Sequence, residues 1–298
     1  MSSAPKVFLL TGASRGLGRA IAEAVLDAGH RLVGTARDPR QLDDLVARHG
    51  DRVRAVALDV VDADAARDAV RTAVDAFGRL DVVVNNAGYA DLAAVEDVTL
   101  DAFRAQIDTN LLGVVNVTKA ALPALREQGS GHIIQVSSVG GRMATPGLGA
   151  YQAAKWAVGG FSEVLAAEVA PLGIKVTVLE PGGMRTDWAG SSMTIPPISA
   201  PYAPTVGATA ERMSGFADAA ASDPAKVAQL VLAVAGLDDP PLRLLVGSDA
   251  YNYGRAAWQG RVDADAEWAA LSTSTDRDDA TAEELDPLAR ALTDRTQR

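Results

Sequence analysis

Residues Val7-Phe8-Leu9-Leu10 run directly into Thr11-Gly12-Ala13-Ser14-Arg15-Gly16-Leu17-Gly18, and this stretch decides the fold. The apolar run predicts a buried strand, and the apolar spacing that starts at Leu17 predicts an amphipathic helix. Gly12 permits a tight turn, Gly16 lets backbone approach a ligand closely, and Gly18 lets the helix pack on the strand. Free N–H groups at the helix N-terminus attract anions, so the segment is typical of a phosphate cradle. A bare turn is the alternative, because the spacing is Gly-x3-Gly-x-Gly.

Short strands and amphipathic helices alternate through the first 180 residues. Buried strands are predicted at Val7–Leu10, Leu32–Thr35, Val53–Leu58, Leu80–Val84, Ile133–Val136, Ile174–Leu179 and, later, Leu242–Val246. Helices are predicted at Leu17–Ala28, Leu42–His49, Ala65–Phe77, Phe103–Leu125 and Tyr151–Val169. Right-handed crossovers between such strands give a parallel sheet with helices on both faces. The pattern therefore predicts a doubly wound α/β protein, a Rossmann fold of about seven strands in one domain over residues 1–298.

Two segments depart from this alternation. Residues 184–222 hold Met184, Trp188, Met193, Tyr202 and Met213 without a sustained period, which predicts a structureless substrate lid. Residues 250–298 form a predicted helical extension, in which Thr281-Ala-Glu-Glu284 is a capping box ahead of Leu285, Leu288 and Leu292. Met and aromatic side chains in a lid suit a partly apolar substrate, although they also serve to pack a lid on the core.

Composition excludes several classes of function. The 298 residues carry 38 Asp and Glu against 28 Lys and Arg, a formal net charge of −10 that disfavours nucleic acid. The chain has no Cys, and its His residues are His30, His49 and His132, far apart in sequence, so no metal site is expected. No run approaches the ~18 apolar residues of a membrane span. We therefore expect a cytoplasmic protein without a membrane partner.

The end of the second strand bears on the choice of dinucleotide. An NAD site usually has a carboxylate here for the ribose 2′-OH, but this chain reads Ala36-Arg37-Asp38. Arg37 and Arg15 suit a 2′-phosphate, because guanidinium groups pair with phosphate oxygens. NADP(H) is favoured. If the strand ended two residues later, Asp38 would take the carboxylate role and NAD(H) would compete.

A second set of residues predicts proton chemistry. Ser138 ends the fifth strand, and Tyr151 and Lys155 follow at helical i, i+4 spacing, which places phenol and ammonium on one helix face. We expect the cation to lower the pKa of the phenol, so that Tyr151 exchanges a proton with a substrate oxygen that Ser138 holds. His132 stands at the opposite end of its strand from Ser138, so we interpret it as structural.

Taken together, these residues resemble the short-chain dehydrogenase/reductase family from about Val7 to Gly183. The resemblance implies that Asn110, Ser138, Tyr151 and Lys155 are catalytic, Asn110 positioning Lys155 through water. It implies cofactor contacts from the glycine loop (Gly12, Ser14, Arg15, Gly16, Leu17, Gly18), from Arg37, Asp59 and Val60, from the turn Asn86, Ala87 and Gly88, from Tyr151 and Lys155, and from Pro181, Gly182 and Thr186. Asp59 would meet the adenine, and Thr186 the nicotinamide carboxamide. Gly183, the longer lid and the extension depart from the family pattern.

The leading hypothesis is an NADP(H)-dependent oxidoreductase that interconverts a ketone or aldehyde with an alcohol. A redox sensor that binds NADP(H) without turnover is an alternative, although it would not need Tyr151 and Lys155. A lyase or epimerase that uses the cofactor transiently is another, because fold and motif do not determine the net reaction. By analogy with the family, we expect a homodimer or homotetramer.

Overall fold

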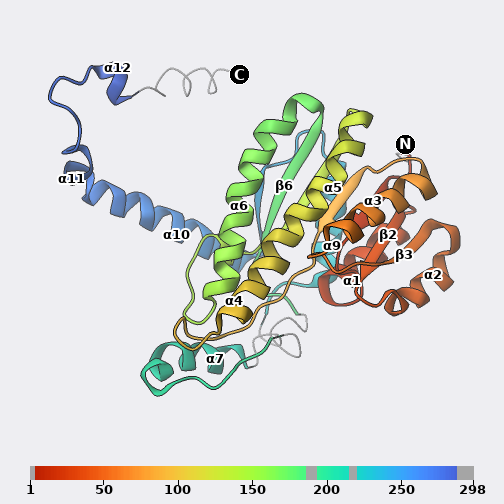
Figure 1. The fold of residues 1–298 in the computed structure, drawn as a ribbon, viewed down its shortest axis with the longest axis horizontal. Coiled ribbons are helices and arrows are strands. Elements are labelled where there is room, and N and C mark those ends of the chain that lie inside the picture. The colour runs from red at the N-terminus through yellow and green to blue at the C-terminus, as the bar shows by residue number, and fades with distance from the viewer. Residues whose placement is uncertain (1–3, 186–192, 215–219, 287–298) are drawn as a thin grey trace. The chain divides into compact units, whose positions relative to one another are not determined.

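Seven parallel strands form one sheet in the part of the chain that the structure describes, as predicted (Figure 1). The computed structural model describes residues 4–185, 193–214 and 220–286. The strand order is β3-β2-β1-β4-β5-β6-β7. Strands β2 and β3 extend the sheet on one side of β1, and β4 to β7 extend it on the other. The strands are β1 (Val7–Leu10), β2 (Arg31–Ala36), β3 (Val53–Ala57), β4 (Val82–Asn85), β5 (Gly131–Val136), β6 (Ile174–Pro181) and β7 (Arg243–Val246).

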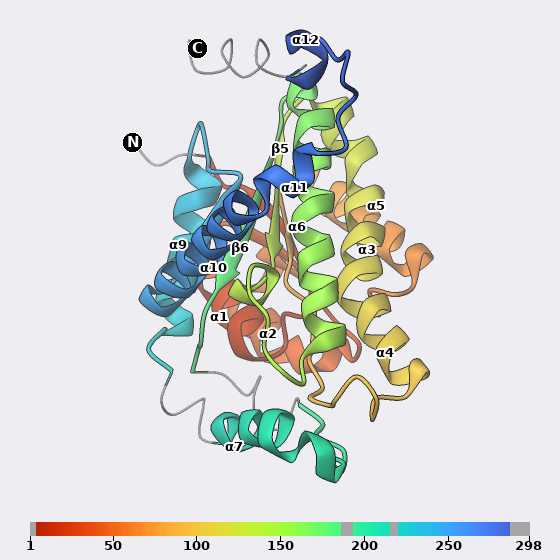
Figure 2. The ribbon, with the colours of Figure 1, turned by 90° about the vertical axis from the view of Figure 1, so that its left-hand side faces the viewer.

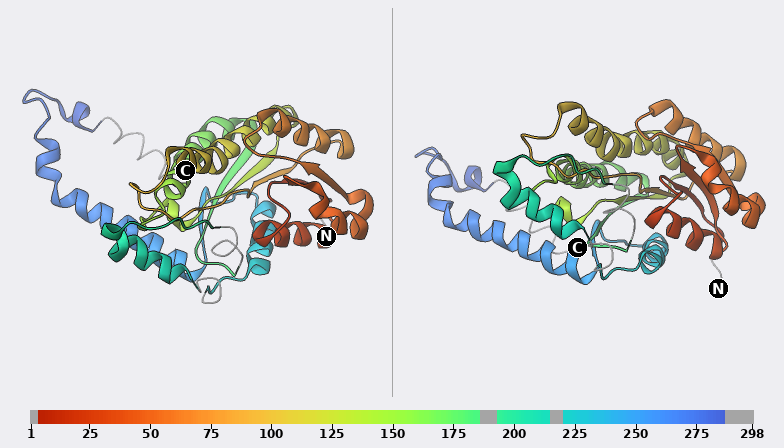
Figure 3. Two further views of the ribbon diagram at one scale, coloured as in Figure 1. Left: turned by 60° about the horizontal axis from the view of Figure 1, so that its bottom comes forward. Right: turned by 90° about the horizontal axis from the view of Figure 1, so that it is seen from below.

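Helices cover both faces of this sheet. The helices up to residue 236 are α1 (Gly16–Asp27), α2 (Asp43–His49), α3 (Ala63–Phe77), α4 (Leu100–Ile107), α5 (Gly113–Gln128), α6 (Gly149–Val169), α7 (Ala208–Met213), which belongs to the lid, and α9 (Pro224–Gly236). Figure 2 shows α1 and α9 on one side of the strands and α3, α5 and α6 on the other, and Figure 3 shows the same layers from two further directions.

The alternation of side chains along β1 explains the two layers. Phe8 and Leu10 point into a core with α1 and α9, whereas Val7 and Leu9 point into a core with α3, α5 and α6. All four side chains are almost completely buried. A strand with apolar residues on both faces is stable only between two layers, which is why the first strand reads as an unbroken apolar run.

The predicted helix at Phe103–Leu125 is interrupted. A π-helical turn, Asp108–Leu112, separates α4 from α5. The Asn110 amide donates to the carbonyl oxygen of Gln106, the acceptor that the main-chain N–H of residue 110 uses in a regular helix. A side chain that takes a main-chain acceptor widens the ladder locally, and such turns concentrate at functional sites.

The lid is more regular than predicted. Residues 200–213 form a 3₁₀ turn (Ala200–Tyr202), a π turn (Ala203–Gly207) and the six-residue helix α7. These pieces are too short to produce a visible apolar period, so the sequence pattern missed them. Val206 is buried here against Leu92 and Leu148.

The chain divides into two compact units, Met1–Gly254 and Arg255–Arg298, and the boundary falls within helix α10 (Ser248–Glu267). The second unit continues through α11 (Ala269–Thr273) and α12 (Ala282–Leu285). The predicted capping box is confirmed, because the Thr281 hydroxyl and the Glu284 carboxylate bond each other's backbone N–H groups. Leu288 and Leu292 lie outside the described residues. Within the described ranges, no helix is both long and apolar enough to cross a bilayer.

Candidate active site

A cleft of ≈ 1190 Å³ lies at the carboxyl ends of the strands, within the first unit. This is the edge where doubly wound sheets bind ligands, beside the point where the strand order reverses. The predicted residues that line it are Gly12, Ser14, Arg15, Gly16, Leu17, Gly18, Arg37, Asp59, Val60, Asn86, Ala87, Gly88, Ser138, Tyr151, Lys155, Pro181 and Gly182. Asn110 is fully buried behind the wall, and Thr186 lies outside the described residues.

The glycine loop is shaped for a ligand that needs close approach. Gly12 and Gly16 have φ of 66° and 53°, in the left-handed region that favours glycine. A Cβ on Gly18 would collide with the carbonyl oxygen of Gly12, so α1 packs directly on the loop. Helix α1 begins without a side-chain cap and without an acidic residue in its first turn. Its N-terminal N–H groups and the positive end of its dipole therefore face the cleft unneutralised.

The β4 turn is attached to the glycine loop through Thr11. The Thr11 hydroxyl accepts hydrogen bonds from the N–H groups of both Asn86 and Ala87, each at 3.0 Å. The Asn86 amide in turn donates to the carbonyl oxygens of Thr11 at 3.0 Å and Gly12 at 3.2 Å. Two walls of the cleft are thus joined across 75 residues of chain.

The end of β2 presents cations to the cleft. Strand β2 ends at Ala36, and the next residue, Arg37, is exposed at the cleft, as is Arg15. Neither guanidinium forms an ion pair with a carboxylate in the described part of the chain. Asp38 is already engaged: its carboxylate accepts from the Arg40 backbone N–H at 3.1 Å and from the Arg40 guanidinium at 2.8 and 2.9 Å, and this pairing lowers the pKa of Asp38.

Ser138, Tyr151 and Lys155 converge on the other end of the cleft. The Lys155 ammonium lies 5.6 Å from the centroid of the Tyr151 ring and donates to the carbonyl oxygen of Val136 at 2.9 Å. The Ser138 hydroxyl accepts from the N–H of Gly140 at 3.0 Å and interacts with the Tyr151 hydroxyl.

The expected lowering of the Tyr151 pKa by Lys155 is not found. Burial raises the pKa of Tyr151 to about 12, and the opposing influence is the Ser138 side chain. Burial also lowers the pKa of Lys155 to about 8. Desolvation disfavours the charged form of each group, and the ammonium donates its hydrogen bond to a backbone carbonyl. Burial therefore favours the protonated phenol of Tyr151.

Asn110 fixes the chain that passes beside Lys155. Its amide oxygen accepts from the N–H of Tyr89 at 3.1 Å, and its amide nitrogen donates to the carbonyl of the same residue at 2.9 Å. A Cβ on Gly88 would lie 2.5 Å from the Asn110 oxygen and 3.7 Å from the Lys155 nitrogen. Gly88 thus lies between the side chains of Asn110 and Lys155.

The lid is attached to the wall of the cleft at Thr194. Its N–H donates to the Asp91 carboxylate at 3.0 Å, and its carbonyl accepts from Leu92 at 3.0 Å. Met193, Tyr202 and Met213 pack on a cluster of buried residues that includes Tyr151. Met184 packs instead against the core around α1 and α9, and Trp188 lies outside the described residues.

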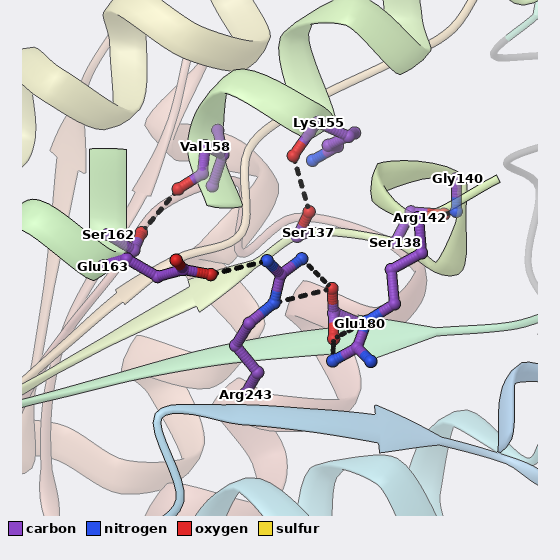
Figure 4. A network of polar contacts seen from close by, with 10 residues as sticks. All are labelled: Ser137, Ser138, Gly140, Arg142, Lys155, Val158, Ser162, Glu163, Glu180 and Arg243. Atoms are coloured by element: carbon purple, nitrogen blue, oxygen red, sulfur yellow. Dashed lines mark hydrogen bonds and ion pairs between the residues drawn. The ribbon is translucent and has the colours of Figure 1, made fainter. Parts of the chain in front are cut away.

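Two acidic residues near the site were not predicted from the sequence. Asp249, in the first turn of α10, lines the cleft and accepts from the N–H of Gly183 at 2.7 Å. Glu180 is completely buried, next to Pro181, and pairs with Arg142 and Arg243 (Figure 4). A carboxylate at the end of an otherwise apolar strand was the available signal for Glu180. Asp249 had no such signal, because it lies in the first turn of a helix and is separated from Gly183 in the sequence by the whole lid.

The histidines lie away from this chemistry. His132 is buried at the start of β5, where its ring bonds the Thr177 hydroxyl at 2.9 Å, and burial lowers its pKa to about 4. His30 accepts from the Lys6 N–H at the end of α1. In the described ranges, no three His, Asp or Glu side chains gather as metal ligands would.

Comparison with known proteins places the whole arrangement in one family. Residues 6–194 match the family model described as short chain dehydrogenase. The chain is 56% identical over 271 residues to the oxidoreductase BOA17 of Botryotinia fuckeliana, covering 91% of this chain and 99% of that relative. The chain therefore belongs to the short-chain dehydrogenase/reductase family of oxidoreductases.

Solved structures agree with this assignment. A short-chain dehydrogenase from Streptomyces avermitilis is similar with a TM-score of 0.86 and 39% identity, over 93% of this chain and all of that one. An alcohol dehydrogenase from Thermococcus sibiricus, complexed with 5-hydroxy-NADP, is similar with a TM-score of 0.67 and 29% identity, over 81% and 95% of the two chains. A 3-ketoacyl-(acyl-carrier-protein) reductase from Brucella melitensis, complexed with NADH, is similar with a TM-score of 0.70 and 26% identity, over 82% and 98%.

Proposed function

We propose that this protein is an NADP(H)-dependent oxidoreductase that interconverts a ketone or aldehyde with an alcohol, with Tyr151 as the general acid and base. The observation that carries the proposal is the convergence of Ser138, Tyr151 and Lys155 on one end of a cleft whose other end is a glycine cradle. Each residue comes from an element that the sheet topology brings to the same edge.

The residues of the cleft fit a nicotinamide dinucleotide. The Gly12, Gly16 and Gly18 backbone leaves room for a pyrophosphate, and the uncapped start of α1 offers N–H groups to it. Pro181, Gly182 and Thr186 would hold the nicotinamide, as the family resemblance implies, and Asp59 and Val60 the adenine. The similar Thermococcus sibiricus and Brucella melitensis enzymes carry 5-hydroxy-NADP and NADH, so the family accommodates both dinucleotides.

Charge at the ribose end favours NADP(H) over NAD(H). Arg15 and Arg37 offer two guanidinium groups without carboxylate partners among the described residues. A 2′-phosphate would pair with them, whereas a 2′-OH would leave them unused. Asp38 is the alternative partner for the ribose 2′-OH of NAD(H). Its carboxylate, however, caps the following 3₁₀ turn and binds Arg40.

The bound cofactor would supply or accept hydride at its nicotinamide ring. Ser138 would hold the substrate oxygen, on which negative charge grows as hydride reaches the carbonyl carbon. Tyr151, protonated because its pKa is about 12, would donate its proton to that oxygen. Asn110 would act by holding the Gly88–Tyr89 backbone in place beside Lys155.

The lining of the cleft, from the lid and from the segment before α6, supports a partly apolar substrate. Met143, Leu148, Met184 and Met213 line the cleft together with the polar groups of Thr145 and Gln152. A homodimer or homotetramer and a cytoplasmic location stay predictions, the first measurable by light scattering of the purified protein.

Cofactor titration is the first test. Intrinsic fluorescence is followed as NADPH or NADH is added to the wild type, to Arg15→Ala and Arg37→Ala, and to the control Asp38→Ala. We expect NADPH to bind at least about tenfold more tightly, about 1.4 kcal/mol, with the preference lost in the arginine variants and kept in Asp38→Ala. Equal or reversed preference in the wild type contradicts the NADP(H) proposal.

Turnover is the second test. NADPH consumption is screened over ketones and aldehydes with the wild type, Tyr151→Phe and the control Tyr202→Phe, which removes a lid phenol bonded to Glu96. Tyr151→Phe should keep cofactor affinity and lose at least about a hundredfold in turnover. Binding without turnover of any substrate would favour the redox sensor, and turnover without net cofactor consumption would favour a lyase or epimerase.

A further inference from the structure

Four charged side chains from four elements form a chain of ion pairs behind the catalytic residues (Figure 4). Arg142 lies just after the turn at Val139–Gly141, Glu180 near the end of β6, Arg243 on β7 and Glu163 on α6. Arg142 donates through Nε to Glu180 Oε2 at 2.8 Å, and Arg243 donates through Nη2 to Glu180 Oε1 at 2.5 Å. Arg243 reaches Glu163 at 2.8 Å.

Glu180 is unusual because its carboxylate is buried between two arginines. Its side chain is 0% exposed, while the guanidinium side chains on its two oxygens are 15% and 17% exposed. A buried carboxylate needs partners on both oxygens, and removal of one partner leaves an uncompensated charge. Glu180 therefore holds together the two segments that carry its arginine partners. One of them is the segment that begins at Ser138.

That segment packs on α6 through two glycines and is tied to β6 by an ion pair. Ser138 is followed by Val139, Gly140 and Gly141, and the two glycines carry no side chain. They pack closely on α6: a Cβ on Gly140 would lie 3.2 Å from the Gln152 amide nitrogen, and one on Gly141 would lie 2.9 Å from the Lys155 carbonyl oxygen. Arg142 is the charged side chain of this segment, and it pairs with Glu180 on β6. This ion pair thus acts four residues from the hydroxyl that faces Tyr151.

We infer that Glu180, acting through Arg142, is a positioning residue that sets the Ser138 hydroxyl against Tyr151 and ties it to the strand end that leads into Pro181-Gly182. The inference rests on the proposed function, in which Ser138 and Tyr151 act on one substrate oxygen. It assigns no contact with substrate to Glu180 itself. With Arg243 and Glu163, the network holds two positive and two negative charges.

A positioning role has a consequence that a purely structural role lacks. The Ser138 side chain opposes the effect of burial on the pKa of Tyr151. If the Ser138 segment loosens, this influence is lost and the Tyr151 pKa rises further. In alcohol oxidation Tyr151 must be deprotonated, so the limb of the pH profile moves to higher pH. Lys155 is the charged group beside the Tyr151 ring, and the variants below leave it unchanged.

The experiment compares Glu180→Gln and Arg142→Gln with the matched control Glu163→Gln in the full-length protein. Glu163→Gln removes an ion pair of the same network, on a half-exposed carboxylate whose partner is Arg243 on β7. Arg142→Gln keeps Glu180 paired with Arg243, so it tests the inference even if Glu180→Gln does not fold. Hydrogen exchange of a peptide over residues 137–143 is measured first, and then the pH profile of kcat/KM for alcohol oxidation at saturating NADP⁺.

We expect faster exchange over residues 137–143 in Glu180→Gln and Arg142→Gln, and a wild-type rate in Glu163→Gln. The two test variants should lose about tenfold in kcat/KM, with the limb shifted upward by ~0.5 pH unit or more. Exchange and limb at wild-type positions, or a loss that is uniform over pH with unchanged exchange, would overturn the inference. If the wild type turns over no alcohol or carbonyl, the proposed function fails, while the exchange comparison still decides whether Glu180 holds the Ser138 segment.

Discussion

The Thr11 hydroxyl should contribute more to the free energy of unfolding than a buried hydroxyl usually does. Its side chain is 1% exposed, and its oxygen accepts the N–H groups of both Asn86 and Ala87 at 3.0 Å. Thr11→Val keeps the shape and removes the acceptor, so two backbone donors lose their partner. Each orphaned N–H costs about 1–3 kcal/mol. We expect a loss of about 2–4 kcal/mol in the free energy of unfolding, if the turn relaxes partly toward water.

The matched control is Thr11→Ser, which keeps the acceptor and removes one methyl group, a cost of about 0.8 kcal/mol. For a unit of this size, 1 kcal/mol corresponds to about 2 °C in Tm, so valine should lower Tm by about 4–8 °C and serine by about 2 °C. Circular dichroism melts and urea titrations of the wild type and both variants measure these differences. A valine variant that melts within ~1 °C of the serine variant refutes the assignment of two hydrogen bonds to this oxygen.

Three further predictions concern the cradle and the pH dependence. Gly18→Ala places a Cβ against the Gly12 carbonyl and should abolish dinucleotide binding in a fluorescence titration, whereas Gly236→Ala, with open space around its Cβ, should bind as the wild type does. Because the folded-state pKa of His132 is lowered to about 4, the unfolded chain binds more protons between pH 4 and 6.5. Stability is then full above pH 6.5 and falls by about 3 kcal/mol toward pH 4; urea titrations at both pH values should show this loss and its near absence in His132→Asn. Because the pKa of Lys155 is lowered from 10.5 to about 8, stability should rise from pH 8 to 10.5 by about 3 kcal/mol; if Lys155→Met shows the same rise in urea titrations, the assignment to Lys155 is wrong.

The local pattern of the sequence was sufficient for the fold. The run Val7–Leu10 is apolar at every position because both faces of β1 are covered, as expected for a parallel strand between two helical layers. The glycines after it could be interpreted residue by residue, because Gly12 and Gly16 form the turn with positive φ and Gly18 packs on the Gly12 carbonyl six residues earlier. Tyr151 and Lys155 could be paired for the same reason, since i, i+4 spacing on a helix determines which side chains share a face.

What the sequence could not show depends on contacts between distant segments. Thr11 joins β1 to the turn after β4, and Asn110 joins the π turn to Tyr89. Periodicity reports which face of an element is apolar, but it carries no information about which polar group lies opposite. The π turn itself was invisible, because one widened turn barely disturbs the apolar spacing on either side.

The electrostatics of the site were decided by tertiary structure alone. From sequence, Lys155 was expected to lower the pKa of Tyr151, yet burial raises that pKa to about 12, because both groups are desolvated. Likewise Glu180 is an acidic residue at a strand end until the fold places arginines from two other elements on its oxygens. Residue types and short spacings thus determined the fold and the candidate chemistry, whereas burial and long-range pairing, which exist only once the chain has packed, determined the charge state in which that chemistry begins.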